Sequence, residues 1–182
     1  MEKWKLLTTK KLLDTKWIKV HENSYELSNK NVIPQYYITE RNDSALCVCY
    51  TGEHFILVEE YRPAIQKIVM CHPGGRIEED DKTPVSGALR ELLEETGYVP
   101  QKVVKLGAFA QIPAVTTSRV HIYLVHCDSN PTYEKKLDRT EELNLKKVTH
   151  DELIRGIDEG KMDCVACVAA SYRALSYLCI PY

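Results

Sequence analysis

The chain has 182 residues, of which 44% are hydrophobic and 27% are charged, and its formal net charge at pH 7 is −2. This length and composition predict one soluble globular unit, because no apolar run approaches the roughly 20 residues that would cross a bilayer. Residues 1–11 lack the apolar stretch of a secretion signal, so we expect a cytoplasmic protein. No basic run could follow a phosphate backbone, so neither a nucleic acid nor a membrane is expected as a partner.

The seven cysteines lie mostly in apolar segments. In a chain without an export signal they are expected to be reduced thiols in the core. Cys164 and Cys167 form a CxxC pair, but no second pair of cysteines or histidines lies at zinc-finger spacing. Both lie in a segment of small residues that is typical of a helix. Buried thiols are therefore preferred over structural zinc.

The first 61 residues predict β-structure. Residues 16–21 and 32–39 are rich in β-branched and aromatic side chains, and a polar turn separates them, which predicts a two-stranded antiparallel unit. Residues 45–50 and 54–61 follow at a spacing that suits a hairpin. Because both of the latter runs are nearly continuously apolar, we expect them in a buried sheet.

The middle of the chain changes to a loop at residues 72–76 and then to a helix. Thr83 as N-cap and Pro84 at the first helical position begin this helix, and Gly97 ends it. The later predicted elements are three strands and two helices, at residues 103–111, 120–127, 143–148, 151–159 and 163–178. The whole order predicts an α/β fold, with a mixed β-sheet between helices and an N-terminal antiparallel β-sheet extension.

Glu91, Glu94 and Glu95 are spaced three and four residues apart, so they share one face of the predicted helix. Such crowding of like charges destabilises a helix by a few tenths of a kcal/mol per pair unless a positive group compensates. Arg90 is one such group, and a divalent cation is another. Hard cations such as Mg²⁺ bind carboxylate oxygens together with substrate phosphates. The alternative is a solvated acidic face without a ligand.

The sequence around these glutamates resembles the Nudix box of the Nudix hydrolases. It has Gly75, five residues, Asp81, eight residues and then Arg90-Glu-Leu-Leu-Glu-Glu-Thr-Gly-Tyr. The family pattern is Gly, five residues, Glu, seven residues and Arg-Glu-apolar-x-Glu-Glu-x-Gly-apolar. The second half matches at every specified position. In the first half, Asp81 replaces glutamate and one extra residue precedes Arg90.

This resemblance implies a Nudix-type fold and a set of metal ligands. Glu91, Glu94 and Glu95 would bind Mg²⁺ or Mn²⁺, Arg90 would orient them by ion pairing, and the Gly74 carbonyl would complete a metal shell. All four side chains are thereby predicted to be catalytic.

Sequence outside the box resembles the ADP-ribose and nucleotide-sugar pyrophosphatase branch. The matching features are the run Glu59-Glu-Tyr-Arg-Pro, the loop Pro73-Gly-Gly, Pro113 fifteen residues beyond Tyr98, and the run Glu159-Gly-Lys-Met-Asp. They imply hydrolysis of the pyrophosphate bond of a nucleoside diphosphate sugar such as ADP-ribose, giving a nucleoside monophosphate and a sugar phosphate. The residues implied in substrate binding are Arg62, Gly74, Gly75 and Pro113.

The general base in this branch comes from an acidic loop after the box. The corresponding segment here begins at Asp138, and either Glu141 or Glu142 is the predicted base. The alternative for each residue is a solvated loop charge.

Two other functions stay open at this point. One is a Nudix hydrolase of another nucleotide class, such as a dNTP or a dinucleoside polyphosphate, which the Glu-x-Tyr-Arg-Pro run and Pro113 disfavour. The other is a catalytically silent Nudix-like nucleotide-binding module, which the full set of box residues disfavours.

The resemblance also predicts assembly and domain organisation. Residues 1–40 would form an N-terminal β extension that builds a homodimer and part of the substrate pocket, and residues 41–182 would form the Nudix hydrolase domain. An isolated hairpin is marginally stable in water, which agrees with a packing partner for this extension. Twofold homodimers are also the commonest soluble oligomers.

Overall fold

The computed structural model describes residues 2–137 and 139–182, so Asp138 of the predicted acidic loop lies outside the described residues. The chain divides into two compact units. Unit 1 comprises Met1–Asp43 and Ala110–Arg119, and unit 2 comprises Ser44–Phe109 and Val120–Tyr182. The predicted domain boundaries at residues 40 and 41 stay a prediction. Within the described ranges, no helix is long and apolar enough to span a membrane.

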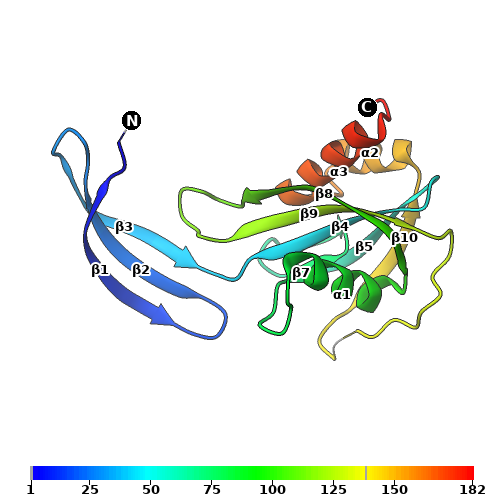
Figure 1. Ribbon diagram of the computed structural model, residues 1–182, viewed down its shortest axis with the longest axis horizontal. Helices are drawn as coiled ribbons and strands as arrows, with labels where there is room; N and C mark the ends of the chain where they lie inside the picture. The colour runs from blue at the N-terminus through cyan, green and yellow to red at the C-terminus, as the bar shows by residue number, and fades with distance from the viewer. Residues whose placement is uncertain (1, 138) are drawn as a thin grey trace. The chain divides into compact units, whose positions relative to one another are not determined.

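Unit 1 contains a three-stranded antiparallel sheet, with β1 (Lys5–Asp14), β2 (Lys19–Glu26) and β3 (Val32–Glu40) in that order (Figure 1). The expected two-stranded unit was therefore wrong, because β1 was missed. All ten residues of β1 are exposed, and its pairing with β2 contains two register shifts. Each shift changes which side chains face which side of the sheet, so the sequence shows no simple alternation.

Unit 2 is built on a seven-stranded mixed sheet (Figure 1). Its strands are β4 (Ser44–Tyr50), β5 (Phe55–Arg62), β6 (Lys67–Cys71), β7 (Gly74–Arg76), β8 (Pro100–Ala110), β9 (Arg119–Cys127) and β10 (Leu143–Val148). The main order is β10-β5-β4-β9-β8, with β6 paired to β5 and β7 paired to β4. The β4–β9 pair is parallel, whereas β5 is antiparallel to β4, β6 and β10.

Helices pack on both faces of this sheet. Cys47 and Cys49 of β4 share a buried cluster with Leu92 of α1 (Pro84–Thr96). Val48, between them, points to the opposite face, into a cluster with Leu153 of α2 (His150–Asp158) and with α3 (Val165–Leu178). This alternation is the two-residue period of a strand buried on both faces. The predicted α/β fold with a mixed sheet between helices is confirmed.

The helix that carries the glutamates has the predicted ends. The Thr83 side chain accepts a hydrogen bond from the Ser86 N–H, and Pro84 is the first helical residue. Gly97 has a left-handed conformation (φ 71°), and its N–H donates to the Leu93 carbonyl. Glycine adopts this conformation without a steric cost.

Two short strands were not predicted. β6 was not expected, and β7 was expected to be a loop. β7 has only three residues and begins with two glycines, so it has no local pattern of a strand. It forms by pairing Gly75 with Ala45 of β4, which lies 30 positions away in the sequence.

All seven cysteines are free thiols, as expected, and five of them are buried. Cys164 is partly exposed. Cys179, expected in the core, is exposed at the C-terminal end of α3.

Candidate active site

Strand β7 lies directly against the glutamate face of α1. The Gly74 N–H donates a hydrogen bond of 3.0 Å to Glu95 Oε2. At position 74, where φ is 150°, a β-carbon would lie only 2.2 Å from the Ala45 carbonyl oxygen, so glycine is needed there. At position 75, a β-carbon would lie 2.5 Å from Glu91 Oε1, so this glycine brings the backbone close to the carboxylate. Gly74, Gly75, Glu91 and Glu95 are thus brought together as predicted residues of one site. The predicted metal contact of the Gly74 carbonyl stays a prediction.

Arg90 binds the acidic groups around it. Its Nη1 donates to Glu91 Oε1 at 3.1 Å and to Glu94 Oε2 at 3.0 Å. Its Nε and Nη2 donate to the two oxygens of Asp81, at 3.2 and 3.0 Å. A guanidinium is suited to such a set because its N–H donors form a rigid planar fork. Arg90 therefore holds two of the three glutamates in position.

Asp81 had no predicted role in the site, although its place in the box pointed to it. Its side chain is buried, and Oδ2 also accepts the Glu78 N–H at 2.8 Å. The hydrogen bonds from Arg90 hold the pKa of Asp81 below its usual range. Despite the shorter side chain and the extra residue in the loop, Asp81 reaches the arginine and anchors it.

The carboxyl groups of Glu91 and Glu95 are desolvated. Burial raises the pKa of Glu91 to about 7, although the neighbouring Arg90 opposes this rise. Burial also raises the pKa of Glu95 to about 8. The hydrogen bond from Gly74 lowers this pKa, whereas the charges of Glu91, Glu60 and Glu141 raise it further. Strongly raised pKa values are typical of functional sites. Glu94 differs, since 39% of its side chain is exposed.

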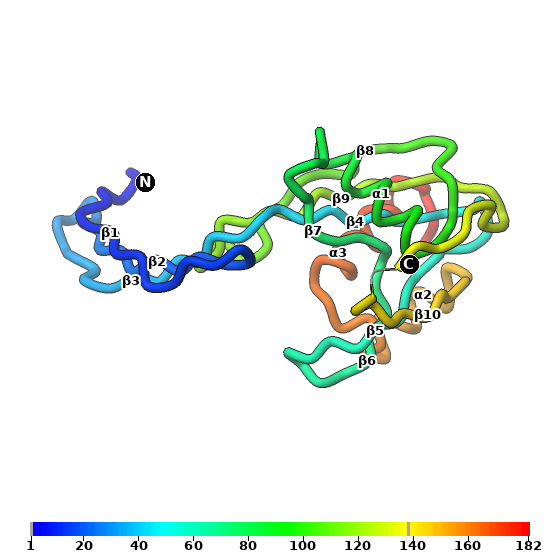
Figure 2. The backbone as a smooth tube through the Cα atoms, turned by 90° about the horizontal axis from the view of Figure 1, so that it is seen from below, coloured from blue at the N-terminus to red at the C-terminus, as the bar shows by residue number. Residues whose placement is uncertain are grey.

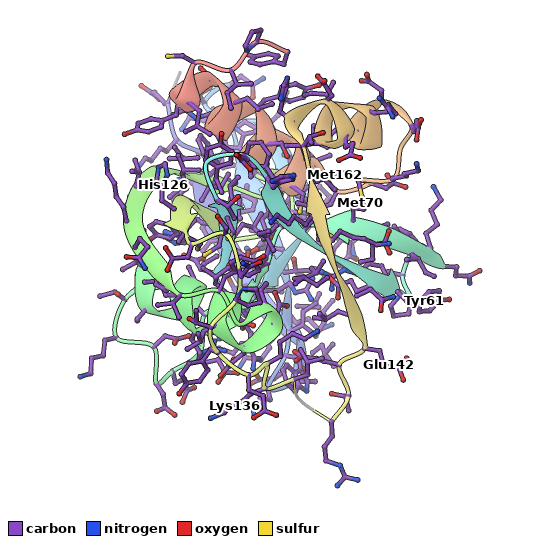
Figure 3. All side chains as sticks on the ribbon, turned by 90° about the vertical axis from the view of Figure 1, so that its right-hand side faces the viewer. Tyr61, Met70, His126, Lys136, Glu142 and Met162 are labelled. Atoms are coloured by element: carbon purple, nitrogen blue, oxygen red, sulfur yellow. The ribbon has the colours of Figure 1, made fainter. Side chains whose placement is uncertain are left out.

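A cavity of about 370 Å³ adjoins Glu95 and is lined also by Glu60, Glu141 and Glu142. Figure 3 labels Tyr61 of β5 and Glu142, just before β10, at the same edge of unit 2. Glu60 was not predicted as a site residue. Burial raises its pKa, and the Glu141 charge raises it further, while Arg62 opposes the rise. The cavity thus gathers carboxylates from three separate parts of the chain.

The donor set fits a hard divalent cation. Carboxylate oxygens are the ligands that Mg²⁺ and Mn²⁺ prefer, and the desolvated Glu91 and Glu95 lack the water that would otherwise stabilise their charge. In the described part of the chain, however, no three side chains of histidine, cysteine, aspartate or glutamate are already arranged to hold a metal ion.

Of the other two predicted substrate residues, Arg62 lies beside the carboxylate cavity and Pro113 lies in unit 1. Arg62, at the end of β5, is half exposed and forms an ion pair with Glu60. Pro113 belongs to unit 1, where it lines a cavity of about 460 Å³ together with Trp4, Tyr25 and Tyr36. Their contacts with substrate stay predictions.

Arg90→Lys should lower kcat by about 10- to 100-fold, which is the usual cost of losing a group that orients metal ligands. A lysine cannot donate to both oxygens of Asp81 and to Glu91 and Glu94 at once. The measurement is steady-state kinetics with ADP-ribose and Mg²⁺. Arg155→Lys, on the exposed surface of α2, is the matched control and should keep wild-type kinetics. Equal kinetics for both variants would contradict the orienting role.

Residues 40–165 match the NUDIX domain family, which covers more than half of the chain. The chain belongs to the Nudix family and is a Nudix hydrolase. A crystal structure of an ADP compounds hydrolase has the same fold, with a TM-score of 0.85 over 98% of this Nudix hydrolase and 95% of that chain, at 19% sequence identity. The resemblance inferred from the box is confirmed.

Curated relatives cover most of the chain. The methanol dehydrogenase activator of Bacillus methanolicus is 27% identical over 94% of this Nudix hydrolase and 92% of that protein. The ADP-ribose pyrophosphatase of Bacillus subtilis is 24% identical over the same shares. The GDP-mannose pyrophosphatase of Pectobacterium atrosepticum is 29% identical over 68% of this chain and 69% of that protein.

Proposed function

We propose that this Nudix hydrolase cleaves the pyrophosphate bond of a nucleoside diphosphate sugar such as ADP-ribose, in the cytoplasm and with Mg²⁺ or Mn²⁺ as cofactor. The main support is the desolvated pair Glu91 and Glu95 on α1, of which Glu95 lines a cavity that Glu60 and Glu141 also line. The relatives named as ADP-ribose and GDP-mannose pyrophosphatases support the substrate class. The free thiols fit a reducing compartment.

Glu91, Glu94 and Glu95 would hold the cations, together with the Gly74 carbonyl. When bound, such ions neutralise charge on phosphate oxygens and lower the pKa of water. The raised pKa values, of about 7 and about 8, bring the titration of Glu91 and Glu95 close to neutral pH in the metal-free protein. A cation held by these carboxylates would require them to be deprotonated, so the affinity for metal should rise with pH.

The remaining steps belong to this chain's own groups. A water molecule attacks one phosphorus atom, and the bond from that phosphorus to the bridging oxygen breaks. Glu141 accepts the proton from this water; its support is its charge, which raises the pKa of Glu60, Glu91 and Glu95. Arg62 offsets the negative charge of the substrate phosphates.

Hydrolysis of ADP-ribose should release AMP and ribose 5-phosphate in equal amounts, with no free phosphate until a phosphatase is added. The measurement is product analysis by chromatography across ADP-ribose, ADP-glucose, GDP-mannose, UDP-glucose and dNTPs with Mg²⁺. Inorganic pyrophosphate released from a dNTP at a higher kcat/KM would move the protein to the triphosphate-cleaving class. Binding of these nucleotides without turnover of any would favour the silent module.

We also propose a homodimer built through the predicted extension at residues 1–40. Its support is the solvent exposure of β1, including the large apolar side chains Leu6, Leu7, Leu12 and Leu13, which are 42–51% exposed. Exposed apolar surface is a feature of interaction sites, and these four side chains lie on one edge strand. A dimer would cover them.

Light scattering of the full chain should therefore give twice the 20.9 kDa chain mass at micromolar concentration. Leu7→Lys should weaken this association, because it places a charge among the apolar side chains. Lys10→Gln, on the same strand, is the matched control and should leave the mass unchanged. These point variants disturb the fold less than deletion of residues 1–40 would, because the deletion also removes the hydrogen bond from the Thr39 N–H to the Val115 carbonyl. A monomer at micromolar concentration would contradict the proposal.

A further inference from the structure

Three cysteines lie together away from the glutamate face of α1. Cys164 is the N-cap of α3, with an extended backbone, and Cys167 is the third residue of that helix. Cys71 ends β6. Cys71 and Cys167 belong to the same buried core, and Cys164 packs against it. A helix N-terminus and a CxxC sequence each lower the pKa of a thiol and so favour the reactive thiolate.

Two contacts hold the segment before α3 against β6. The Met70 N–H donates to the Lys161 carbonyl at 2.8 Å. Next to it, Lys67 Nζ lies 2.8 Å from Asp163 Oδ2. The segment before α3 accordingly runs beside β6 in Figure 2, and Met70 and Met162 are neighbours in Figure 3. Cys71 and the CxxC pair are therefore held together by contacts other than their own.

The two thiols of the CxxC pair have opposite character. The hydrogen bond from the Cys167 thiol, the N–H groups of Cys167 and Ala166, and the Arg62 charge lower the pKa of Cys164 to about 5. The pKa of Cys167 is instead raised, by its hydrogen bonds with Cys164 and Cys71 and by burial. Cys164 is partly exposed, whereas Cys167 is 2% exposed. Cys164 is thus the more acidic and the more exposed residue of the pair, and Cys167 is the protected one.

We propose that Cys164 and Cys167 form a reversible dithiol–disulfide site that reacts with small disulfides such as oxidised glutathione. Cys164, the N-cap, and Cys167, the third helical residue, lie at the two ends of the first turn of α3, and the Cys164 side chain forms no capping hydrogen bond there. A metal site is the less suitable reading, because no three metal-binding side chains in residues 2–137 and 139–182 are arranged to hold an ion.

The reaction has two exchange steps. The Cys164 thiolate attacks one sulfur of oxidised glutathione, the sulfur–sulfur bond breaks, and one glutathione leaves as a thiolate that takes up a proton. Cys167 then gives its proton to solvent and attacks the Cys164 sulfur, which displaces the second glutathione. Two protein thiols are oxidised, and one disulfide is reduced to two thiols. Excess reduced glutathione reverses both steps.

The test uses the reduced full chain, incubated at pH 7 with excess oxidised glutathione, quenched with acid, alkylated and analysed by peptide mass spectrometry. We expect a Cys164–Cys167 disulfide, the loss of two alkylatable thiols, and full recovery with dithiothreitol. Cys164→Ser should abolish this disulfide without disturbing the helix, since serine is a favoured N-cap. Cys179→Ser removes an exposed lone thiol and is the matched control, expected to behave as wild type.

Two further readouts separate the roles of the sulfurs. Cys167→Ala should leave Cys164 as a stable mixed disulfide with glutathione, because the resolving thiol is gone. In the reduced wild type at pH 7, iodoacetamide should modify Cys164 about tenfold faster than Cys179, since the thiolate is the nucleophile. The proposal is overturned if all seven thiols survive the oxidised glutathione. It is also overturned if Cys164→Ser is oxidised like wild type, or if Cys71 replaces Cys167 in the disulfide.

Discussion

Glu95→Gln is expected to lower kcat by about 10³-fold or more and to stabilise the metal-free protein. A bound cation supplies several kcal/mol of charge stabilisation to the reaction, and each 1.4 kcal/mol or so corresponds to a factor of ten in rate. Glutamine keeps the acceptor for the Gly74 N–H but carries no charge. The variant therefore removes a proposed metal ligand while it resembles the protonated carboxyl group.

The stability change follows from the raised pKa of Glu95. Between its ordinary value of 4.5 and about 8, the folded state binds this proton more tightly than the unfolded state does. The contribution of Glu95 to the stability of the metal-free wild type is thus fully present below pH 4.5, and it is lost as the pH rises to about 8. Glutamine has no such loss, so the variant should have the higher melting temperature at pH 8.5.

The measurement is thermal unfolding in chelator at pH 5 and pH 8.5, with kinetics in Mg²⁺ on the same preparations. A gain of about 1 kcal/mol corresponds to a few degrees for a chain of this size. Part of the pH dependence should persist in the variant, because Glu91 also has a raised pKa, of about 7. Glu53→Gln, in the exposed β4–β5 turn, is the matched control and should change neither quantity. Near wild-type kcat in Glu95→Gln would show that the ligand assignment is wrong.

Glu141→Gln should lower kcat by about 10²- to 10⁴-fold, the range for loss of a general base, whereas Glu142→Gln should stay near wild type. Both residues are exposed and line the same cavity, so the pair of variants is closely matched. The Glu141 charge contributes to the raised pKa values of Glu91 and Glu95.

Profiles of kcat against pH, measured at saturating Mg²⁺, distinguish a base from a structural residue. The acidic limb of the wild-type profile should disappear in Glu141→Gln, with the melting temperature unchanged. If Glu142→Gln shows the larger loss, the roles are reversed. If neither variant is impaired, the base lies outside the loop.

Features that depend on a few neighbouring residues were predictable. The N-cap at Thr83, the left-handed Gly97 and the shared face of Glu91, Glu94 and Glu95 all follow from local capping and from the period of the helix. The strand at Leu143–Val148 also has the predicted bounds. In these cases the interacting groups lie within one turn or one strand.

The fold was predicted wrongly where a strand forms because of its pairing with another strand. β1 has no alternating pattern because its register with β2 shifts twice, and β7 is a strand only because β4 lies beside it. Such strands are set by a partner distant in sequence, which a local pattern does not reveal.

The sequence by itself determined that this protein carries a Nudix box and that three glutamates lie on one helix face. Only the tertiary structure decided that Gly74 donates to Glu95, that Asp81 anchors Arg90 and that Glu60 and Glu141 approach the same cavity. The physical reason is desolvation. Burial and charges from distant segments set the pKa values of Glu91 and Glu95, and neither burial nor proximity in space is a property of residue spacing.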